Sequence, residues 1–355
     1  MKMPFAGAIV LALACSFSSG QQPSGGTHDP QITAAFVQHT VASIEALIRD
    51  KYFDTGAIAR IEAALAAAEQ QGIYSRANDL RDLSAKLNET LDETSHDKHL
   101  FVRTSELPGA NSTESALPRT ESSRMDNYGM KRAEVLDGNV GYLQITAFYR
   151  ANEGAESLET AMKFLSHTDA LILDLRNNGG GSPDTAIQLL SYFFMQPNLP
   201  LFSIVPRSGE PAIYYAQATG VAYRDESRPL YVLVSGSTWS AGEAVPFILQ
   251  ERHRATIVGE KTAGAANPAG PWPINNSLTI TIPFGRIKSA VNGTNWDGKG
   301  VIPDTAVPAN KAFEAAYADS LKRLMDSTTD AVKQQVLRRA ASAAMAPSFQ
   351  PSKDN

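Results

Sequence analysis

The stretch Leu230-Tyr-Val-Leu-Val-Ser-Gly-Ser-Thr-Trp-Ser240-Ala-Gly-Glu243 predicts a buried strand, a tight turn of small residues and a helix that begins at Ser240. A serine in this position suits nucleophilic chemistry. The turn lifts its hydroxyl out of the sheet, and the first free amides of the helix face any oxyanion that forms. Ser240 and Glu243 also fit a capping box, in which the serine only stabilises the helix start. On this motif alone, both interpretations stay open.

A second segment, Ala170-Leu-Ile-Leu-Asp-Leu-Arg-Asn-Asn-Gly-Gly-Gly-Ser-Pro183, predicts another buried strand, which runs into three glycines. Its final Ser-Pro pair suits the cap and first turn of a helix. Glycines let backbone N–H groups approach a phosphate or a tetrahedral oxyanion closely. No Gly-Lys-Ser/Thr follows, which argues against a nucleotide-binding loop. As an isolated feature, the run is equally well a plain turn.

Strand-like and helical segments alternate around these two motifs, from about residue 140 to 258, and this predicts an α/β layer structure. Residues 30–95 carry three apolar stripes at spacings of three and four, which predict a small helical bundle. Residues 103–127 are rich in Ser, Thr, Pro, Glu and Asn and are predicted to be a loop. We expect one C-terminal helix over 311–345 and a disordered tail over 346–355.

The chain has 355 residues, of which 43% are hydrophobic, and a formal net charge of −5. This composition excludes a disordered tail protein, and the acidic balance argues against non-specific nucleic-acid binding. Lys2 and the apolar run over residues 5–14 are too short for a membrane span and typical of a signal peptide, which we expect over residues 1–20. The protein is therefore predicted to be exported to the periplasm or cell envelope.

Cys15 is the only cysteine of the chain, so an intrachain disulfide is impossible. It lies in the processing zone, which excludes a cysteine protease. Ala12-Leu-Ala14 has the small-x-small form that a signal peptidase cuts. The same residues before Cys15 resemble a bacterial lipobox, and a lipid on Cys15 would then be the means of membrane attachment.

Two further segments carry candidate catalytic side chains. His99, in Asp97-Lys-His-Leu100, is a candidate base for Ser240. Asp297, in Asn295-Trp-Asp-Gly298, is a candidate carboxylate to orient that histidine. His96 and His99 are also possible metal ligands, but no further Cys or His cluster completes a site. No metal or other cofactor is predicted.

In their order and spacing, these segments together resemble the tail-specific (C-terminal-processing) serine protease family. The branch they resemble most contains the interphotoreceptor retinoid-binding protein repeats and the tricorn core protease. The likeness extends from about residue 30 to 310 and also includes Val258-Gly-Glu-Lys-Thr-Ala-Gly264 and Gly300-Val-Ile-Pro-Asp304. It implies an α/β catalytic domain of the crotonase/ClpP-like spiral fold over residues 96–310, preceded by the helical bundle.

The resemblance implies a role for each candidate residue. Ser240 is the nucleophile and His99 its base, and Asp297 stands where that branch has a glutamate. The backbone amides of Ala241 and Gly180 form the oxyanion hole. The substrate is accordingly a peptide or protein.

The chain also departs from other members of the family. Ala265 occupies the place of the lysine that forms a Ser–Lys dyad in those members. The interval from His99 to Val140 is too short for the peptide-binding PDZ module that many relatives insert there. The missing lysine and the shorter Asp297 motivate a second hypothesis, a non-catalytic binder of apolar ligands such as a retinoid or fatty acid. An esterase of the α/β-hydrolase type is disfavoured, because Thr238 stands where a glycine is expected.

Overall fold

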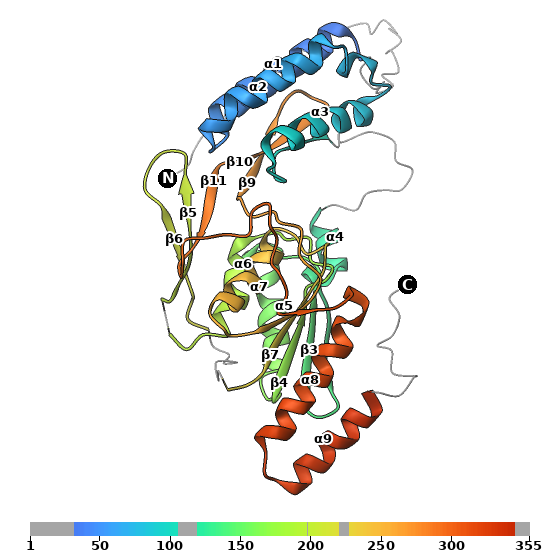
Figure 1. Cartoon of the computed structure of the whole chain (residues 1–355), viewed down its shortest axis with the longest axis vertical. Coiled ribbons are helices and arrows are strands. Elements are labelled where there is room, and N and C mark those ends of the chain that lie inside the picture. Colours follow the sequence, from blue (N-terminus) through green and yellow to red (C-terminus); the bar gives the residue numbers. More distant parts are fainter. Residues whose placement is uncertain (1–31, 106–118, 197, 220–226, 345–355) are drawn as a thin grey trace, which may run out of the picture.

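The computed structural model describes residues 32–105, 119–196, 198–219 and 227–344. The predicted signal peptide with Cys15, the predicted tail 346–355 and residues 106–118 of the predicted loop lie outside these ranges. The described chain has helices α1 to α3 at one end, a central sheet, and helices α8 and α9 at the other end (Figure 1). Within the described ranges, no helix combines the length and apolar character that a membrane span requires.

The predicted N-terminal helices are confirmed as α1 (Ala34–Lys51), α2 (Thr55–Gln70) and α3 (Leu80–Ser95). Their apolar stripes face one another in a common core. A three-stranded antiparallel sheet adds to this core, in the order β1 (Phe101–Thr104), β10 (Leu278–Pro283), β9 (Ala269–Pro273). Two strands from late in the sequence therefore pack beside the N-terminal helices.

The predicted α/β layer is confirmed as a six-stranded sheet of order β12-β8-β7-β4-β3-β2. Its strands are β2 (Met130–Leu136), β3 (Val140–Ile145), β4 (Ala170–Asp174), β7 (Leu230–Val234), β8 (Thr256–Gly259) and β12 (Thr305–Ala306). Strands β3, β4, β7, β8 and β12 are parallel, and β2 pairs antiparallel with β3. All residues of β4 and β7 are buried, as expected of strands covered on both faces.

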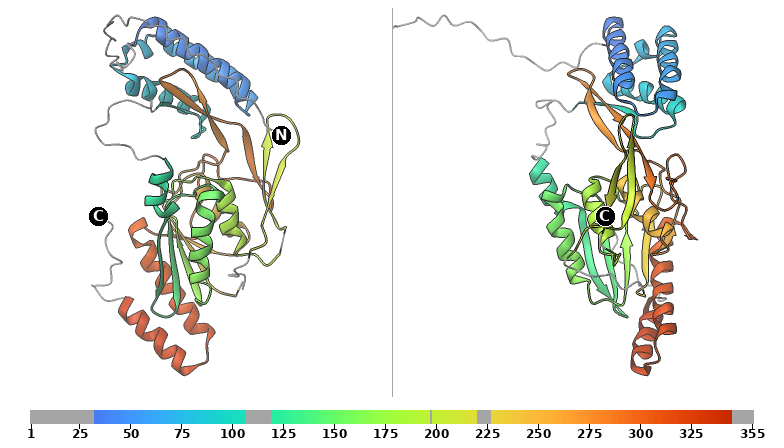
Figure 2. Two further views of the ribbon diagram at one scale, coloured as in Figure 1. Left: turned by 180° about the vertical axis from the view of Figure 1, so that it is seen from behind. Right: turned by 90° about the vertical axis from the view of Figure 1, so that its left-hand side faces the viewer.

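Helices cover both faces of this sheet (Figure 2). One face packs against α5 (Ala151–Phe164), α6 (Pro183–Ser191) and α7 (Ala241–Glu251). The other face packs against α8 (Ala312–Ser327) through Phe313 and Tyr317. Such two-sided coverage leaves the carboxyl ends of the parallel strands as the place where loops from several strands meet.

A second three-stranded sheet, of order β11-β5-β6, contains a hairpin that projects beside the central layer (Figure 1). It consists of β5 (Pro200–Pro206), β6 (Ala212–Tyr215) and β11 (Gly285–Ser289). Three short 3-10 helices complete the described structure, namely η1 (Tyr74–Arg76), η2 (Asn127–Gly129) and η3 (Ala309–Lys311).

Two expected segments differ from the structure. The C-terminal part is not one helix over 311–345, because α8 ends at Ser327 and α9 spans Ala331–Ala344. Asp330 causes the break by capping the second helix, with Oδ1 accepting hydrogen bonds from the N–H of Val332 and Lys333. Within the predicted loop 103–127, the chain forms the helix α4 (Arg119–Met125). The polar composition of this segment predicts a loop and gives no signal for the short helix.

Candidate active site

Ser240 is the N-cap of α7 and follows β7 after a five-residue turn, as the sequence predicts. Its φ of 54° and ψ of −119° are strained for a residue with a side chain. This backbone conformation is typical of a nucleophile presented on a sharp strand-to-helix turn. The capping box with Glu243 is present as well. Capping and catalysis are therefore compatible roles of the same turn.

His99 lies between α3 and β1, and its Nε2 is 3.0 Å from the hydroxyl of Ser240. The structure thus joins two residues that are 141 positions apart in the sequence. The imidazole is 8% exposed and makes an edge-on contact with the ring of Trp239. Burial lowers the pKa of His99 to about 4, so the ring is neutral near pH 7 and able to accept the serine proton.

The two predicted oxyanion donors differ in their present partners. Ala241 is the first residue of α7, and its N–H has no acceptor within the helix. The N–H of Gly180 donates to Oδ1 of Asn178 over 2.9 Å, so it reaches an oxyanion only by sharing or releasing this bond. Gly180 has a φ of +86°, and a Cβ there would lie 2.9 Å from Cβ of Ser240. The glycine therefore permits the close approach of the two loops.

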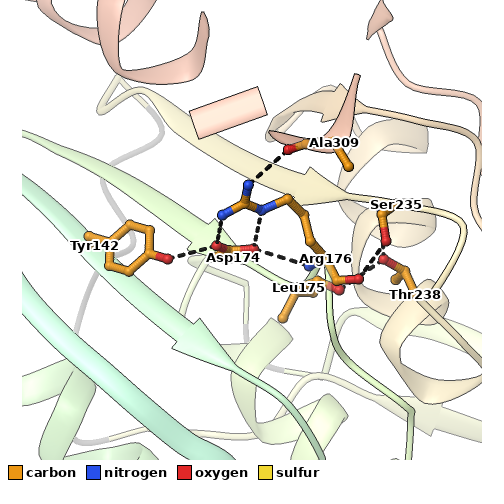
Figure 3. Close-up of polar contacts among 7 residues, drawn as sticks. All are labelled: Tyr142, Asp174, Leu175, Arg176, Ser235, Thr238 and Ala309. Carbon is orange, nitrogen blue, oxygen red and sulfur yellow. Dashed lines mark hydrogen bonds and ion pairs between the residues drawn. The ribbon is translucent and has the colours of Figure 1, made fainter. Parts of the chain in front are cut away.

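Buried polar contacts hold residues 175–181, here called the glycine loop, against residues 235–240, here called the serine loop (Figure 3). Oγ of Ser235 donates to the carbonyl of Arg176 over 2.5 Å, and Oγ1 of Thr238 donates to the carbonyl of Leu175 over 2.8 Å. The guanidinium of Arg176 forms a bidentate ion pair with Asp174, whose side chain is 1% exposed. These contacts fix the main chain that leads from β7 to Ser240.

The same ion pair connects the glycine loop to distant parts of the fold (Figure 3). The hydroxyl of Tyr142, on β3, donates to Oδ2 of Asp174 over 2.6 Å. Nη1 of Arg176 donates to the carbonyl of Ala309, just before α8, over 2.8 Å. Because Asp174 is buried, its pairing with Arg176 offsets the cost of removing the charge from water.

Glu243 has a larger role than the capping box predicted from sequence. Its side chain is fully buried, and the carboxylate accepts four hydrogen bonds. The donors are Oγ1 of Thr262 and the backbone N–H groups of Ser240, Gly264 and Ala265. Burial raises the pKa of Glu243, and these donors oppose the rise. One carboxylate therefore ties the turn at Ser240 to the loop of residues 262–265.

Asp297, the predicted third member, makes no hydrogen bond to His99 within the described part of the chain. Its Oδ2 accepts a hydrogen bond from Nδ2 of Asn267 over 2.8 Å, and its Oδ1 accepts one from the N–H of Ala266 over 3.3 Å. Burial raises the pKa of this carboxyl group. Its role beside the histidine stays a prediction.

Two residues that the sequence analysis did not propose lie between Asp297 and His99. Nδ2 of Asn267 also donates to Oδ2 of Asp97 over 3.1 Å, and Oδ1 of Asp97 accepts from the backbone N–H of His99 over 3.0 Å. Asp97 further accepts a bond from the hydroxyl of Tyr52, at the C-cap of α1. The Asp-x-His spacing was the available signal for Asp97, whereas nothing local distinguished Asn267.

The described residues contain no group of three or more His, Cys, Asp or Glu side chains arranged to hold a metal ion. The groups that do converge are a hydroxyl, an imidazole and a helix N-terminus, which are the components of acyl-transfer chemistry.

Comparisons with known proteins agree with this geometry. A model described as Peptidase family S41 matches residues 139–307, and a model described as the N-terminal domain of Peptidase_S41 in eukaryotic IRBP matches residues 33–135. The chain belongs to peptidase family S41. The predicted resemblance to tail-specific proteases is confirmed.

Among curated relatives of this S41 chain, carboxyl-terminal-processing peptidase 2 of Arabidopsis thaliana is 29% identical over 188 residues. The match covers 52% of the chain and 35% of that protein. The chain thus spans about a third of that relative's length.

Solved structures show the shared fold at low sequence identity. The photosystem II D1 C-terminal processing protease has a TM-score of 0.50 and 15% identity, with 87% of this chain and 98% of that chain covered. A lipoprotein from Streptococcus agalactiae has a TM-score of 0.53 and 14% identity, with 81% and 96% covered. The predicted fold class, that of the S41 proteases, is therefore confirmed.

Proposed function

We propose that this S41 chain is a serine peptidase that hydrolyses peptide bonds of a peptide or protein substrate, with Ser240 as nucleophile and His99 as base. The contact of 3.0 Å between Oγ of Ser240 and Nε2 of His99, at the N-terminus of α7, carries this proposal. The matched family model and the curated relatives are peptidases, and they give no support to the alternative of an apolar-ligand binder.

The first half of the reaction forms an acyl-enzyme. Oγ of Ser240 attacks the substrate carbonyl carbon while Nε2 of His99 takes its proton. The N–H of Ala241 donates to the oxyanion, joined by that of Gly180 when Asn178 gives up its bond. The tetrahedral intermediate collapses as His99 passes the proton to the leaving amine.

In the second half, water attacks the ester with His99 again acting as base, and the serine is released with its proton. Because the ring of His99 is buried and its pKa is lowered, the neutral form required at the start of both halves is the resting form. Apart from Ser240 itself, His99 is the only side chain that gains and loses a proton in these steps.

A recess of about 380 Å³ beside the glycine loop supports the proposal of a peptide substrate. Its lining includes Phe148, Tyr149, Arg150, Glu153 and residues 180–183. Gly180 belongs both to this recess and to the contact with Ser240. A side chain next to the scissile bond can therefore enter it while the carbonyl lies at the nucleophile.

The test is cleavage of casein by the purified protein, compared with Ser240→Ala and His99→Ala. We expect cleavage by the wild type and losses in both variants of at least about 10³-fold, since the pair acts as a unit. Modification of Ser240 by a fluorophosphonate, seen as a mass increase on its tryptic peptide, provides a second readout that needs no correct substrate. A folded wild type that is not modified, or a Ser240→Ala variant that cleaves at the wild-type rate, contradicts the assignment.

We further propose that the protein is exported after removal of residues 1–20 or is lipidated on Cys15, on the grounds of the N-terminal sequence. The fold shared with a lipoprotein of Streptococcus agalactiae is compatible with a place in the cell envelope. Intact-mass measurement of the mature chain distinguishes plain cleavage from a diacylglyceryl cysteine, and an unprocessed N-terminus contradicts both.

A further inference from the structure

We propose that Asn267 is the residue that positions His99, with Oδ1 of Asn267 accepting a hydrogen bond from the Nδ1–H of the histidine during catalysis. This inference rests on the peptidase function proposed above and names a further residue of the same site. Asn267 then takes the place expected for Asp297 as the direct partner of His99, and the proposed triad is Ser240, His99 and Asn267.

The contacts of Asn267 fix which way its side-chain amide points. Nδ2 donates to Oδ2 of Asp97 over 3.1 Å and to Oδ2 of Asp297 over 2.8 Å. Carboxylate oxygens accept hydrogen bonds, and an amide nitrogen carries two hydrogens, one for each carboxylate. The amide oxygen in this place would face two acceptors. Chemistry therefore assigns the nitrogen to the carboxylates and leaves Oδ1 of Asn267 for a donor.

His99 presents the complementary requirement. While Nε2 accepts the proton of Ser240, the neutral ring carries its own proton on Nδ1. Nδ1 of His99 and Oδ1 of Asn267 are both buried, and neither has a hydrogen-bond partner in the described ranges. A buried polar atom without a partner is costly, so a donor and an acceptor left over in one cluster indicate a bond between them.

Asp97 shows that the two residues share one cluster. Its Oδ1 accepts from the backbone N–H of His99 over 3.0 Å, and its Oδ2 accepts from Nδ2 of Asn267. The bond between Nδ1 and Oδ1 is not formed in this structure. Catalytic hydrogen bonds are often long in substrate-free sites and shorten in the Michaelis complex. Asn267 is 1% exposed, so bulk water is a poor substitute acceptor.

The carboxylates strengthen Asn267 as an acceptor. Hydrogen bonds from an amide nitrogen to negative groups shift electron density toward the amide oxygen, and chains of such bonds reinforce one another. Asp97 and Asp297 accept both amide protons, and Tyr52 donates to Asp97 from the N-terminal helices. Asp297 thus acts on the histidine through Asn267.

The direct test is nitrogen-15 NMR of the histidine rings in the full chain at neutral pH, with His99 assigned by the signals that vanish in His99→Ala. We expect the neutral Nδ1–H tautomer with a strongly deshielded ring proton in the wild type. In Asn267→Ala that proton should move upfield or exchange too fast to be seen. An Nε2–H tautomer in the wild type, or an unchanged signal in Asn267→Ala, overturns the proposal. The measurement needs no activity, so it stands apart from any failure of the proposed function.

Kinetics on a cleaved substrate provide the second test. Asn267→Ala is expected to lower kcat by about ten- to a hundred-fold, as for loss of one buried partner, with KM changed by less than about two-fold. The acidic limb of kcat/KM should move to lower pH, because the imidazolium loses an acceptor that favours it.

Asp297→Asn is the matched comparison. If Asp297 contacted His99 directly, this variant would lose about 10⁴-fold, as when a triad carboxylate becomes an amide. Because Asp97 still holds Asn267, we expect a smaller loss than in Asn267→Ala. The reverse order of the two losses overturns the proposal. If Asn267→Ala does not fold, the Nδ1 proton of His99 in the wild type decides, because a ring proton without the strong deshielding of a hydrogen bond overturns the proposal.

Discussion

Replacing Glu243 by Gln should destabilise the protein more than such a conservative change suggests. Oε1 of Glu243 accepts from Thr262 Oγ1 and Gly264 N–H over 2.5 and 2.6 Å, and Oε2 accepts from the N–H of Ser240 and Ala265, both over 2.9 Å. A glutamine offers only one oxygen. Its nitrogen must therefore face two of these donors, whichever way the amide turns.

The magnitude follows from the better of the two amide orientations. With the new nitrogen toward Thr262, the threonine hydroxyl can turn and accept, and the N–H of Gly264 is left as an unsatisfied buried donor at about 1–3 kcal/mol. The remaining bonds also lose their ionic partner, which weakens each by about 0.5–1 kcal/mol. The two surviving bonds are those from Ser240 and Ala265, so the expected loss in free energy of unfolding is about 2–5 kcal/mol, with no loss of helix or strand content.

Urea unfolding at neutral pH, followed by fluorescence and circular dichroism, measures this loss. Glu251→Gln, at the end of the same helix, is the control. Oε2 of Glu251 accepts one bond from Ser289, which an amide oxygen can replace, so a change below about 0.5 kcal/mol is expected. A loss below about 0.5 kcal/mol in Glu243→Gln would refute the reasoning, since a carboxyl group that is already protonated in the fold would explain it.

Three further outcomes are expected. Gly180→Ala should lower kcat by about 10²–10³-fold, because its Cβ would clash with Ser240 and displace an oxyanion donor. In the control Gly179→Ala, the new Cβ meets no atom within 4 Å, so kcat should stay within about ten-fold of the wild type when both variants are assayed in parallel. Arg176→Met leaves a buried carboxylate unpaired and should cost about 3–5 kcal/mol in urea unfolding, and a loss under about 1 kcal/mol contradicts it. The acidic limb of kcat/KM should lie below pH 6.5, because burial lowers the pKa of His99 to about 4 and activity falls only as the ring gains a proton; a pH–rate profile with its limb at or above 6.5 is the contrary result.

The strand–turn–helix around Ser240 was predictable because its signal is local. Within residues 230–243, five consecutive apolar residues favour a strand, the small residues after them favour a turn, and the capping box favours a helix start. The residues alone offered His99 only as a candidate base for Ser240, and the pairing of the two was implied by the family resemblance. No spacing rule links residues 141 positions apart, so composition and periodicity were silent on this contact.

The rest of the site depends on contacts that only the folded chain creates. Asn267 is an unremarkable residue of a loop in the sequence, yet it joins two carboxylates that are 200 positions apart. The break between α8 and α9 was missed for a different reason. Apolar periodicity continues on both sides, and the cap at Asp330 outweighs it locally.

The N-terminal helices support the proposed active site as much as the sheet does. His99, the proposed base, comes from the segment after α3, and the carboxylate of Asp97 that holds its backbone is in turn held by Tyr52, at the end of α1. Ser240, the proposed nucleophile, follows β7 of the central sheet after a five-residue turn. Strands β9 and β10, which come from the same part of the chain as Ser240, pair with β1 and pack against the N-terminal helices next to the segment that carries His99. Because Ser240 and His99 come from different parts of the chain, the proposed chemistry depends on the packing between those parts.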